Sequence, residues 1–388
     1  FLKGDNERCE ALLKRANALE PNELTTIVGL ATVARSLGHF DRALELLKDG
    51  MSADPESAIP MYESGLTLIG QHRLSEAINR LRAAARSDVR SPDVYQALAV
   101  AYAATHNFKK AKQSFATALN LDPSRSSSVN SLASTLLDEG QAQAAATLLT
   151  GFLEERVDPT SLELLAHAQF ELGRFHSAKT SLSKLARNAR QSLPDSAATL
   201  ARYLNNLGVC STRLGEDDVT ESLFVEAIAL APSQSPHPYH NLSGFYARRR
   251  SFSRLVEVLK LCAAQFPNDG KTAAFLALGL ADSGDPDSAI SGLETFLRSH
   301  DDSPEAFAVI GGLIADERMD FDSALGYLRK GRTLFPDNPR LANNFAYVLL
   351  LAGEVAEATN VIQSVESSRI EELDRPMWTA TRGLLSIK

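Results

Sequence analysis

Small and large apolar residues recur along the whole chain at a nearly constant interval. A residue that is usually small is followed four positions later by Leu, Phe or Ile, and we call the first member of each pair the anchor of a unit. The anchors are Cys9, Ala43, Ala77, Ala111, Ala145, Ala178, Thr220, Leu255, Ala289, Ala324 and Ala358. Successive anchors lie 33 to 35 residues apart, except for the 42 residues between Ala178 and Thr220. This regularity predicts a repeat protein.

Three further columns predict the internal structure of each unit. The position twelve before the anchor is small throughout, which permits two helices to cross closely; it holds Ala31, Gly65, Ala99, Ala133, Ala166, Gly208, Ser243, Ala277, Gly312 and Ala346. Glycine recurs five before the anchor, where it can close a helix in the left-handed conformation. Proline recurs twelve after the anchor and ends a second helix. Each unit therefore predicts helix A, a glycine turn, helix B and a proline turn.

This pattern resembles the tetratricopeptide repeat, with Gln96–Pro123 and Asn205–Pro232 as the clearest copies. The resemblance covers essentially the whole chain, although Thr220 and Leu255 depart from the small anchor. It implies an all-α, right-handed α-solenoid (superhelix) of about ten helix–turn–helix repeats in one domain, residues 1–388. A half repeat is expected at each end, as a lone helix B in Phe1–Leu19 and a lone helix A in Pro376–Ile387. The chain is therefore interpreted as a piece of a longer repeat protein.

The 42-residue interval divides the expected superhelix into N-terminal repeats, 1–190, and C-terminal repeats, 191–388. Its eight extra residues fall around Arg187–Leu200. Two helices each longer by about one turn would absorb them, since a turn takes 3.6 residues. The alternative is a ridge or bend that divides the superhelix. We favour the lengthened helices.

The resemblance implies that helix A lines a concave groove with the positions 18, 15, 14 and 11 before the anchor. In the units of Thr220 and Leu255 these positions are polar and basic: Arg202, Asn205, Asn206, His237, His240 and Asn241. Arg213 and Arg248, seven before the same anchors, lie near the groove edge, and Asn130, Asn343 and Asn344 extend the pattern. Arginine suits carboxylates, and asparagine donates to and accepts from a peptide backbone. A solvated helix face with no ligand is the alternative.

Two apolar sets occupy the same columns elsewhere. The first comprises Ala274, Phe275, Leu278, Val309, Ile310 and Leu313, and the second Ile59, Tyr62, Leu66 and Ile69. Apolar side chains at groove positions predict contacts with a partner, while packing on the next unit is the alternative. Together with the polar patch they suit an extended segment or an amphipathic helix that carries a carboxylate and separate apolar anchors.

Composition narrows the function. A net charge of −8 argues against a nucleic-acid footprint, and 44% hydrophobic residues fit a folded soluble chain. Phosphate-loop and metal-ligand motifs are absent, and His237 and His240 lack further ligands. We therefore expect a protein–protein scaffold with no catalytic residue, cofactor, metal or membrane span. Two alternatives stay open: a sensor arm of a larger enzyme, and a periplasmic export scaffold behind a signal peptide. The odd cysteine count favours a cytoplasmic location.

Overall fold

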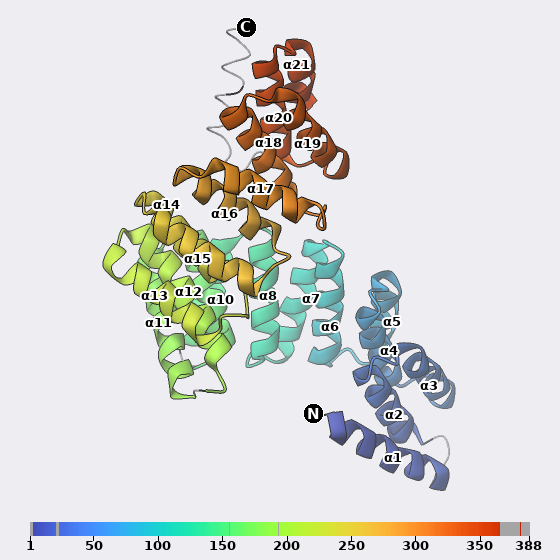
Figure 1. Cartoon of the computed structure of the whole chain (residues 1–388). Helices are drawn as coiled ribbons and strands as arrows, with labels where there is room; N and C mark the ends of the chain where they lie inside the picture. The colour runs from blue at the N-terminus through green and yellow to red at the C-terminus, as the bar shows by residue number, and fades with distance from the viewer. Residues whose placement is uncertain (1–2, 21–22, 155, 193, 365–380, 382–388) are drawn as a thin grey trace. The chain divides into compact units, whose positions relative to one another are not determined.

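The computed structural model describes residues 3–20, 23–154, 156–192, 194–364 and 381, and within them every regular element is an α-helix (Figure 1). The helices are α1 (Lys3–Leu19), α2 (Leu24–Ser36), α3 (Phe40–Ala53), α4 (Ala58–Gly70), α5 (Leu74–Ser87), α6 (Pro92–Ala104), α7 (Phe108–Leu121), α8 (Ser126–Asp138), α9 (Ala142–Leu153), α10 (Pro159–Glu171), α11 (Phe175–Gln191), α12 (Ala197–Leu214), α13 (Asp217–Leu230), α14 (His237–Arg248), α15 (Phe252–Gln265), α16 (Gly270–Asp282), α17 (Pro286–Leu297), α18 (Pro304–Arg318), α19 (Phe321–Leu334), α20 (Pro339–Ala352) and α21 (Val355–Ser364).

The helices form pairs that stack in chain order, which confirms an α-solenoid. An A helix and its B helix pack together, as α6 does with α7 and α12 with α13, and successive A helices also touch, as α16 does with α18. After the lone helix α1, the described residues hold ten helix pairs in chain order, from α2 and α3 to α20 and α21. The predicted helix at Pro376–Ile387 falls almost entirely outside the described residues. None of the described helices is long and apolar enough to cross a membrane.

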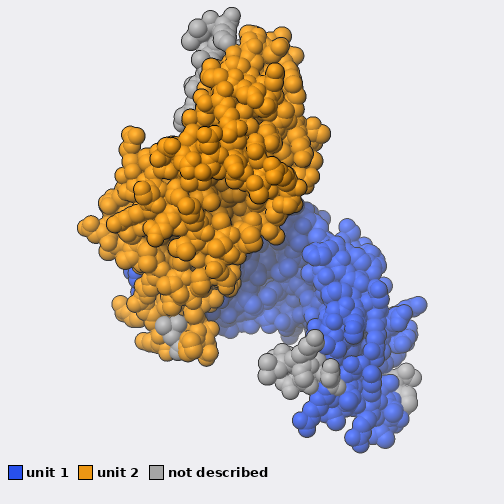
Figure 2. Space-filling view, viewed as in Figure 1, with its two compact units in different colours: residues 1–185 blue, residues 186–388 orange. Residues whose placement is uncertain are grey.

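The chain divides into two compact units, residues Phe1–Leu185 and Ala186–Lys388 (Figure 2). Each unit has its own buried core: Leu98, Phe115 and their neighbours in the first, and Phe307, Leu328 and Phe345 among others in the second. The division after residue 190 and the single superhelical domain of residues 1–388 stay predictions.

The column of small residues marks the crossing of helices A and B within a unit. A Cβ atom on Gly65 would lie 2.5 Å from Leu81, and a Cβ atom on Gly208 would lie 2.5 Å from the ring of Phe224. Leu81 and Phe224 each lie four residues after their anchors, so the two most regular columns of the sequence are the two sides of one contact. Only a small residue fits there, because the partner side chain is fully buried and cannot move aside.

The lengthened unit follows the simpler interpretation. Helix α11 has 17 residues and α12 has 18, whereas the equivalent helices α7 and α6 have 14 and 13. These three and five additional residues account for the eight extra ones. The additional residues of α12 lie mainly at its start, so Arg202 lies in the second turn of that helix.

Candidate partner-binding site

A hollow of about 430 Å³ lies between the N-terminal halves of two successive A helices, α12 and α14. Four of the residues predicted for partner binding line it together: Arg202, Asn205 and Asn206 from α12, and His237 from α14. The turn between α13 and α14 completes the wall with Gln234 and Ser235. The structure therefore brings these four side chains together around one cavity, which the sequence does not reveal, and their contact with a partner stays a prediction.

A chain of amide groups joins the two helices beside this hollow. Asn241 donates from Nδ2 to Asn205 Oδ1 at 2.8 Å, and Asn205 donates in turn to Asn206 Oδ1 at 3.2 Å. Asn205 thus uses both ends of its amide inside the protein. Among the described residues, no acceptor receives a hydrogen bond from the Nδ2 atom of Asn206, so this atom is available as a donor in the hollow that Asn206 lines. Asn205 is therefore engaged within the protein, whereas Asn206 keeps a donor that no described residue accepts.

The charge of the hollow comes from Arg202. Its side chain is exposed, and its guanidinium lies 4.9 Å from the ring centre of Tyr203, which holds the group beside the hollow. His237 is also exposed, and its Nδ1 atom lies 2.6 Å from the hydroxyl of Ser235. With an arginine and an amide donor, the hollow can hold backbone carbonyls or a carboxylate.

His240 has a different role from the one predicted. Its side chain is only 9% exposed, and Nε2 lies 2.8 Å from Thr272 Oγ1 and 3.2 Å from Asp269 Oδ2 on the neighbouring helix α16. Burial lowers the pKa of His240 to about 4, although the nearby Asp269 opposes the shift. The ring is therefore neutral near pH 7 and binds the chain's own next repeat, which corrects its assignment to a partner.

The same contact occurs in the first unit with asparagine in place of histidine. Asn130, fifteen before its anchor like His240, donates to Asp158 Oδ2 at 3.0 Å and accepts from Ser161 Oγ at 2.6 Å. Asp158 also accepts the backbone N–H of Ser161 and so caps α10, as Asp269 caps α16. We call this arrangement the inter-repeat latch. It shows that position fifteen before the anchor joins repeats in both units.

Two predicted arginines and one predicted asparagine lie apart from the hollow. Arg213 and Arg248 are exposed in the last turns of α12 and α14. Asn344 belongs to α20, where its Nδ2 atom donates to the carbonyl of Ala308 on α18 at 2.8 Å, so it joins two helices. Its neighbour Asn343 is buried. The predicted polar patch is therefore one hollow plus separate sites.

Comparison with known proteins agrees with this architecture. The family model described as "Tetratricopeptide repeat" matches residues 68–134, from the end of α4 to α8. The chain is a tetratricopeptide-repeat protein. No curated protein sequence matches it significantly.

Three solved structures of low sequence identity are similar to the chain, and of these yeast Tom70 shows the same fold. Yeast Tom70 is 13% identical, with 98% of this chain and 92% of that chain covered and a TM-score of 0.54. PilF of Pseudomonas aeruginosa is 18% identical over 58% of this chain and 97% of that chain, with a TM-score of 0.47. YrrB, described as a TPR protein with an unusual peptide-binding site, is 18% identical over 50% and 96%, with a TM-score of 0.41.

The apolar patch predicted in the second unit of this tetratricopeptide-repeat protein is largely core. Val309, Ile310 and Leu313 are at most 9% exposed and belong to the buried cluster around Phe307. The placement of these three on an open face is therefore wrong. Phe275 is half-buried with its ring edge-on to His240 at 5.4 Å, and Leu278 is 41% exposed.

The error at Ile310 and Leu313 follows from a one-residue offset in α18. Gly311, not Gly312 as the column predicts, is the residue whose Cβ would meet Leu328, at 2.4 Å. The extra residue of this 35-residue interval therefore lies inside the helix, between the crossing and the anchor Ala324. Each residue of α18 before the turn takes the role expected of the next residue, and one step rotates a side chain by about 100° around the helix. Ile310 and Leu313 consequently face the core.

The second predicted apolar set, in the first unit, is mixed. Ile59 is 55% exposed, whereas Tyr62, Leu66 and Ile69 are half-buried and pack against the core around Phe115. Only Ile59 offers a large free apolar surface. Whether any of these residues touches a partner stays a prediction.

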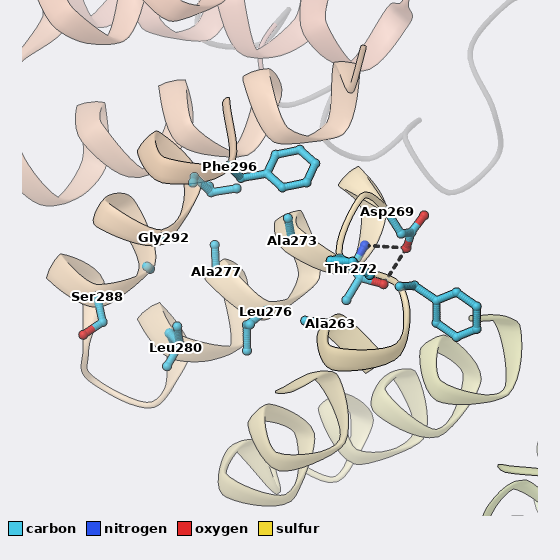
Figure 3. Close-up of a pocket in the computed structure, with 14 residues that line it drawn as sticks. Ala263, Asp269, Thr272, Ala273, Leu276, Ala277, Leu280, Ser288, Gly292 and Phe296 are labelled. Carbon is cyan, nitrogen blue, oxygen red and sulfur yellow. Dashed lines mark hydrogen bonds between the residues drawn. The ribbon is translucent and has the colours of Figure 1, made fainter. Parts of the chain in front are cut away.

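The structure also contains two hollows that the tetratricopeptide-repeat columns did not predict. One, of about 600 Å³, lies at α6 and α8, where Ala103, Ala104, Ser131 and Ser134 leave space. The other, of about 150 Å³, lies among α15, α16 and α17 (Figure 3). Gly292, three residues after its anchor, is one of the residues that line it. The preceding and following repeats carry the larger Val258 and Tyr327 at the equivalent position. A small residue in a column of larger ones is the sequence signal that could have found it.

Proposed function

We propose that this protein is a protein–protein interaction scaffold and that the hollow between α12 and α14 binds an extended segment of a partner. The observation that carries the proposal is the convergence of Arg202, Asn205, Asn206 and His237 on one cavity. A volume of about 430 Å³ is within the usual range for a ligand pocket. Tetratricopeptide repeats suit this role because stacked helix pairs present one long continuous surface.

The donors of the hollow determine what part of a partner it holds. Arg202 and the Nδ2 atom of Asn206 both donate hydrogen bonds, so they pair with backbone carbonyls or with a carboxylate of the partner. The amide chain from Asn241 through Asn205 fixes the orientation of Asn206 before any ligand arrives. A donor that is already positioned loses less entropy on binding.

The test separates the donors from the residue that positions them. The partner is recovered by pull-down on the 388-residue chain with mass spectrometry, and its affinity is then measured by titration. Arg202→Ala combined with Asn206→Ala removes both donors and leaves the Asn205–Asn241 bond intact. We expect affinity to fall at least about tenfold, as for residues at the centre of an interface.

Asn360→Ala is the matched control, because Asn360 is an exposed asparagine on α21 in the same unit. It should leave the affinity unchanged. Circular dichroism must show the same helical content in all proteins. If the double variant binds the partner as tightly as the control does, the hollow is not the binding site.

A further inference from the structure

The C-terminal ends of four successive A helices in the second unit carry a row of exposed charges in a particular order. Arg213 on α12 and Arg248 on α14 are positive, whereas Asp282 on α16 and Asp316 on α18 are negative. The first three lie seven before their anchors. Asp316 takes the equivalent place once the offset of α18 is applied. We call these four residues the charge row.

The charge row is not neutralised inside the protein. Within the described part of the chain, none of its four members forms an ion pair, and only the side chain of Asp316 takes part in a hydrogen bond, which it accepts from Tyr347 at 3.2 Å. Nearby charges are paired instead: Arg249 with Asp217 at 2.7 Å, and Arg318 with Asp287 at 2.9 Å. The row therefore keeps its charges available, in the order two positive and two negative.

Contacts within the unit join the four helices that carry the row in the order of the chain. The Asn205–Asn241 bond joins α12 to α14, the His240 latch joins α14 to α16, and α16 packs on α18. Arg248 follows Asn241 by seven residues, which is two helical turns and the same helix face. Packed helices are about 8–10 Å apart, and an extended chain advances about 3.3 Å per residue. A segment that crosses the row thus meets one charge about every third residue.

The apolar surface beside the row fits the same kind of segment. One turn before Arg248, Gly244 has open space where a Cβ would be, and one turn before Asp282, Leu278 is 41% exposed. A crossing chain can therefore approach α14 closely and place an apolar side chain against Leu278. This contact adds affinity at the point where the charge of the row changes sign.

We propose that the charge row binds an extended partner segment whose own charges run acidic over α12 and α14 and basic over α16 and α18. This inference rests on the proposed scaffold function and specifies the partner. Because the pattern changes sign once, the row selects the order of charges in the partner and not its net charge. It also fixes the direction in which a given segment lies.

Two synthetic peptides of identical composition test the order. The first carries two glutamates followed by two lysines, with two serine or alanine residues between successive charges and with both ends blocked. The second places the same residues so that glutamate and lysine alternate. Binding to the 388-residue chain is followed by fluorescence anisotropy at low ionic strength, where exposed charges are least screened. We expect the first peptide to bind about tenfold more tightly, because exposed pairs are individually weak and four act together.

A charge exchange in the protein should reverse this preference. Arg248→Asp combined with Asp282→Arg converts the row to an alternating pattern while the net charge stays the same. The variant should bind the alternating peptide more tightly than the first peptide. Lys260→Asp combined with Glu257→Arg, at exposed positions of α15, is the control exchange and should keep the original preference.

Three results would overturn the inference. Equal binding of both peptides, or a preference that the exchange at Arg248 and Asp282 does not alter, would show that the order is not read. Absence of binding by either peptide would show that the row is not a docking surface. Self-association of the chain that the exchange abolishes would show that a second copy occupies the row. In each case the Arg202 and Asn206 test still decides the scaffold function separately.

Discussion

The close crossing of α12 and α13 at Gly208 can be tested against a second helical glycine in the second compact unit, Gly244. Gly208 lies where a Cβ would be 2.5 Å from one carbon of the Phe224 ring and 2.8 Å from two others. Gly244, on the next A helix, has nothing within 4 Å of the same ideal position. Both glycines therefore lie inside helices, but only Gly208 is crowded by a neighbouring side chain. Comparing alanine at the two positions isolates the effect of the crossing.

The expected free energies follow from two effects. Alanine in place of glycine inside a helix stabilises the fold by about 1 kcal/mol, because glycine loses more backbone entropy. Overpacking of a buried site destabilises by about 1–3 kcal/mol. Phe224 is 1% exposed and cannot move its ring into solvent. Gly244→Ala should thus be more stable than the parent by about 1 kcal/mol, and Gly208→Ala should be less stable than Gly244→Ala by about 1–3 kcal/mol.

Urea denaturation followed by circular dichroism measures the stability of each variant, and hydrogen exchange with mass spectrometry locates the change. Repeat proteins can unfold in parts, so the local measurement is necessary. Faster exchange should be confined mainly to α12 and α13 for Gly208→Ala. If both variants gain the same stability, the crossing has room for a methyl group and the explanation of the small-residue column fails.

Three further changes test the latch and the smaller hollow. The pKa of His240 is about 4 in the folded protein, whereas its ordinary value is 6.5. As the pH falls, the unfolded chain therefore binds the proton before the folded chain does. The free energy of unfolding should fall by about 3 kcal/mol between pH 6.5 and pH 4. His240→Asn, which copies Asn130, should flatten that dependence in urea titrations at several pH values; an unchanged slope would assign it to other groups. Asn130→Ala should destabilise the first unit by about 1–2 kcal/mol and speed exchange in α8 and α10, whereas no change there would deny the latch a role. Gly292→Ala should raise the free energy of unfolding by about 1 kcal/mol and therefore raise the urea midpoint. A lowered midpoint would mean that the hollow has no room for the methyl group.

The repeat columns predicted the fold because each column corresponds to one repeated contact. Glycine five before the anchor has a positive φ in all six units that carry it, for example 72° at Gly215. The same position is left-handed without glycine at His72, His106, Arg250 and Met319. The turn is therefore imposed by the packing of the two helices, and glycine only makes it easier. The off-pattern anchor Thr220 is fully buried like the alanine anchors, because it occupies the same place in the packing of its helix pair.

The position of an inserted residue could not be predicted from spacing alone. Two intervals measure 35 residues, from Thr220 to Leu255 and from Ala289 to Ala324. In the first, the extra residue lies before α14, because His240 meets Thr272 and Asn130 meets Ser161 from the same positions, fifteen and seventeen residues before their respective anchors. In the second it lies inside α18. An extra residue in a loop leaves the orientation of the following helix unchanged. An extra residue inside a helix rotates every preceding side chain of that helix by about 100°.

Which polar residues face a partner depends on neighbours that a single column does not show. Positions fifteen and fourteen before the anchor are adjacent, and both carry asparagine in α12. Position fifteen meets the start of the next A helix, so a capping aspartate followed three residues later by serine or threonine holds it, as Asp158 and Ser161 hold Asn130. After Asn205 the next helix begins instead at His237 and Pro238, and no such aspartate is present. The amide of Asn205 bonds to Asn241 instead, and Asn206 lines the hollow between the two helices.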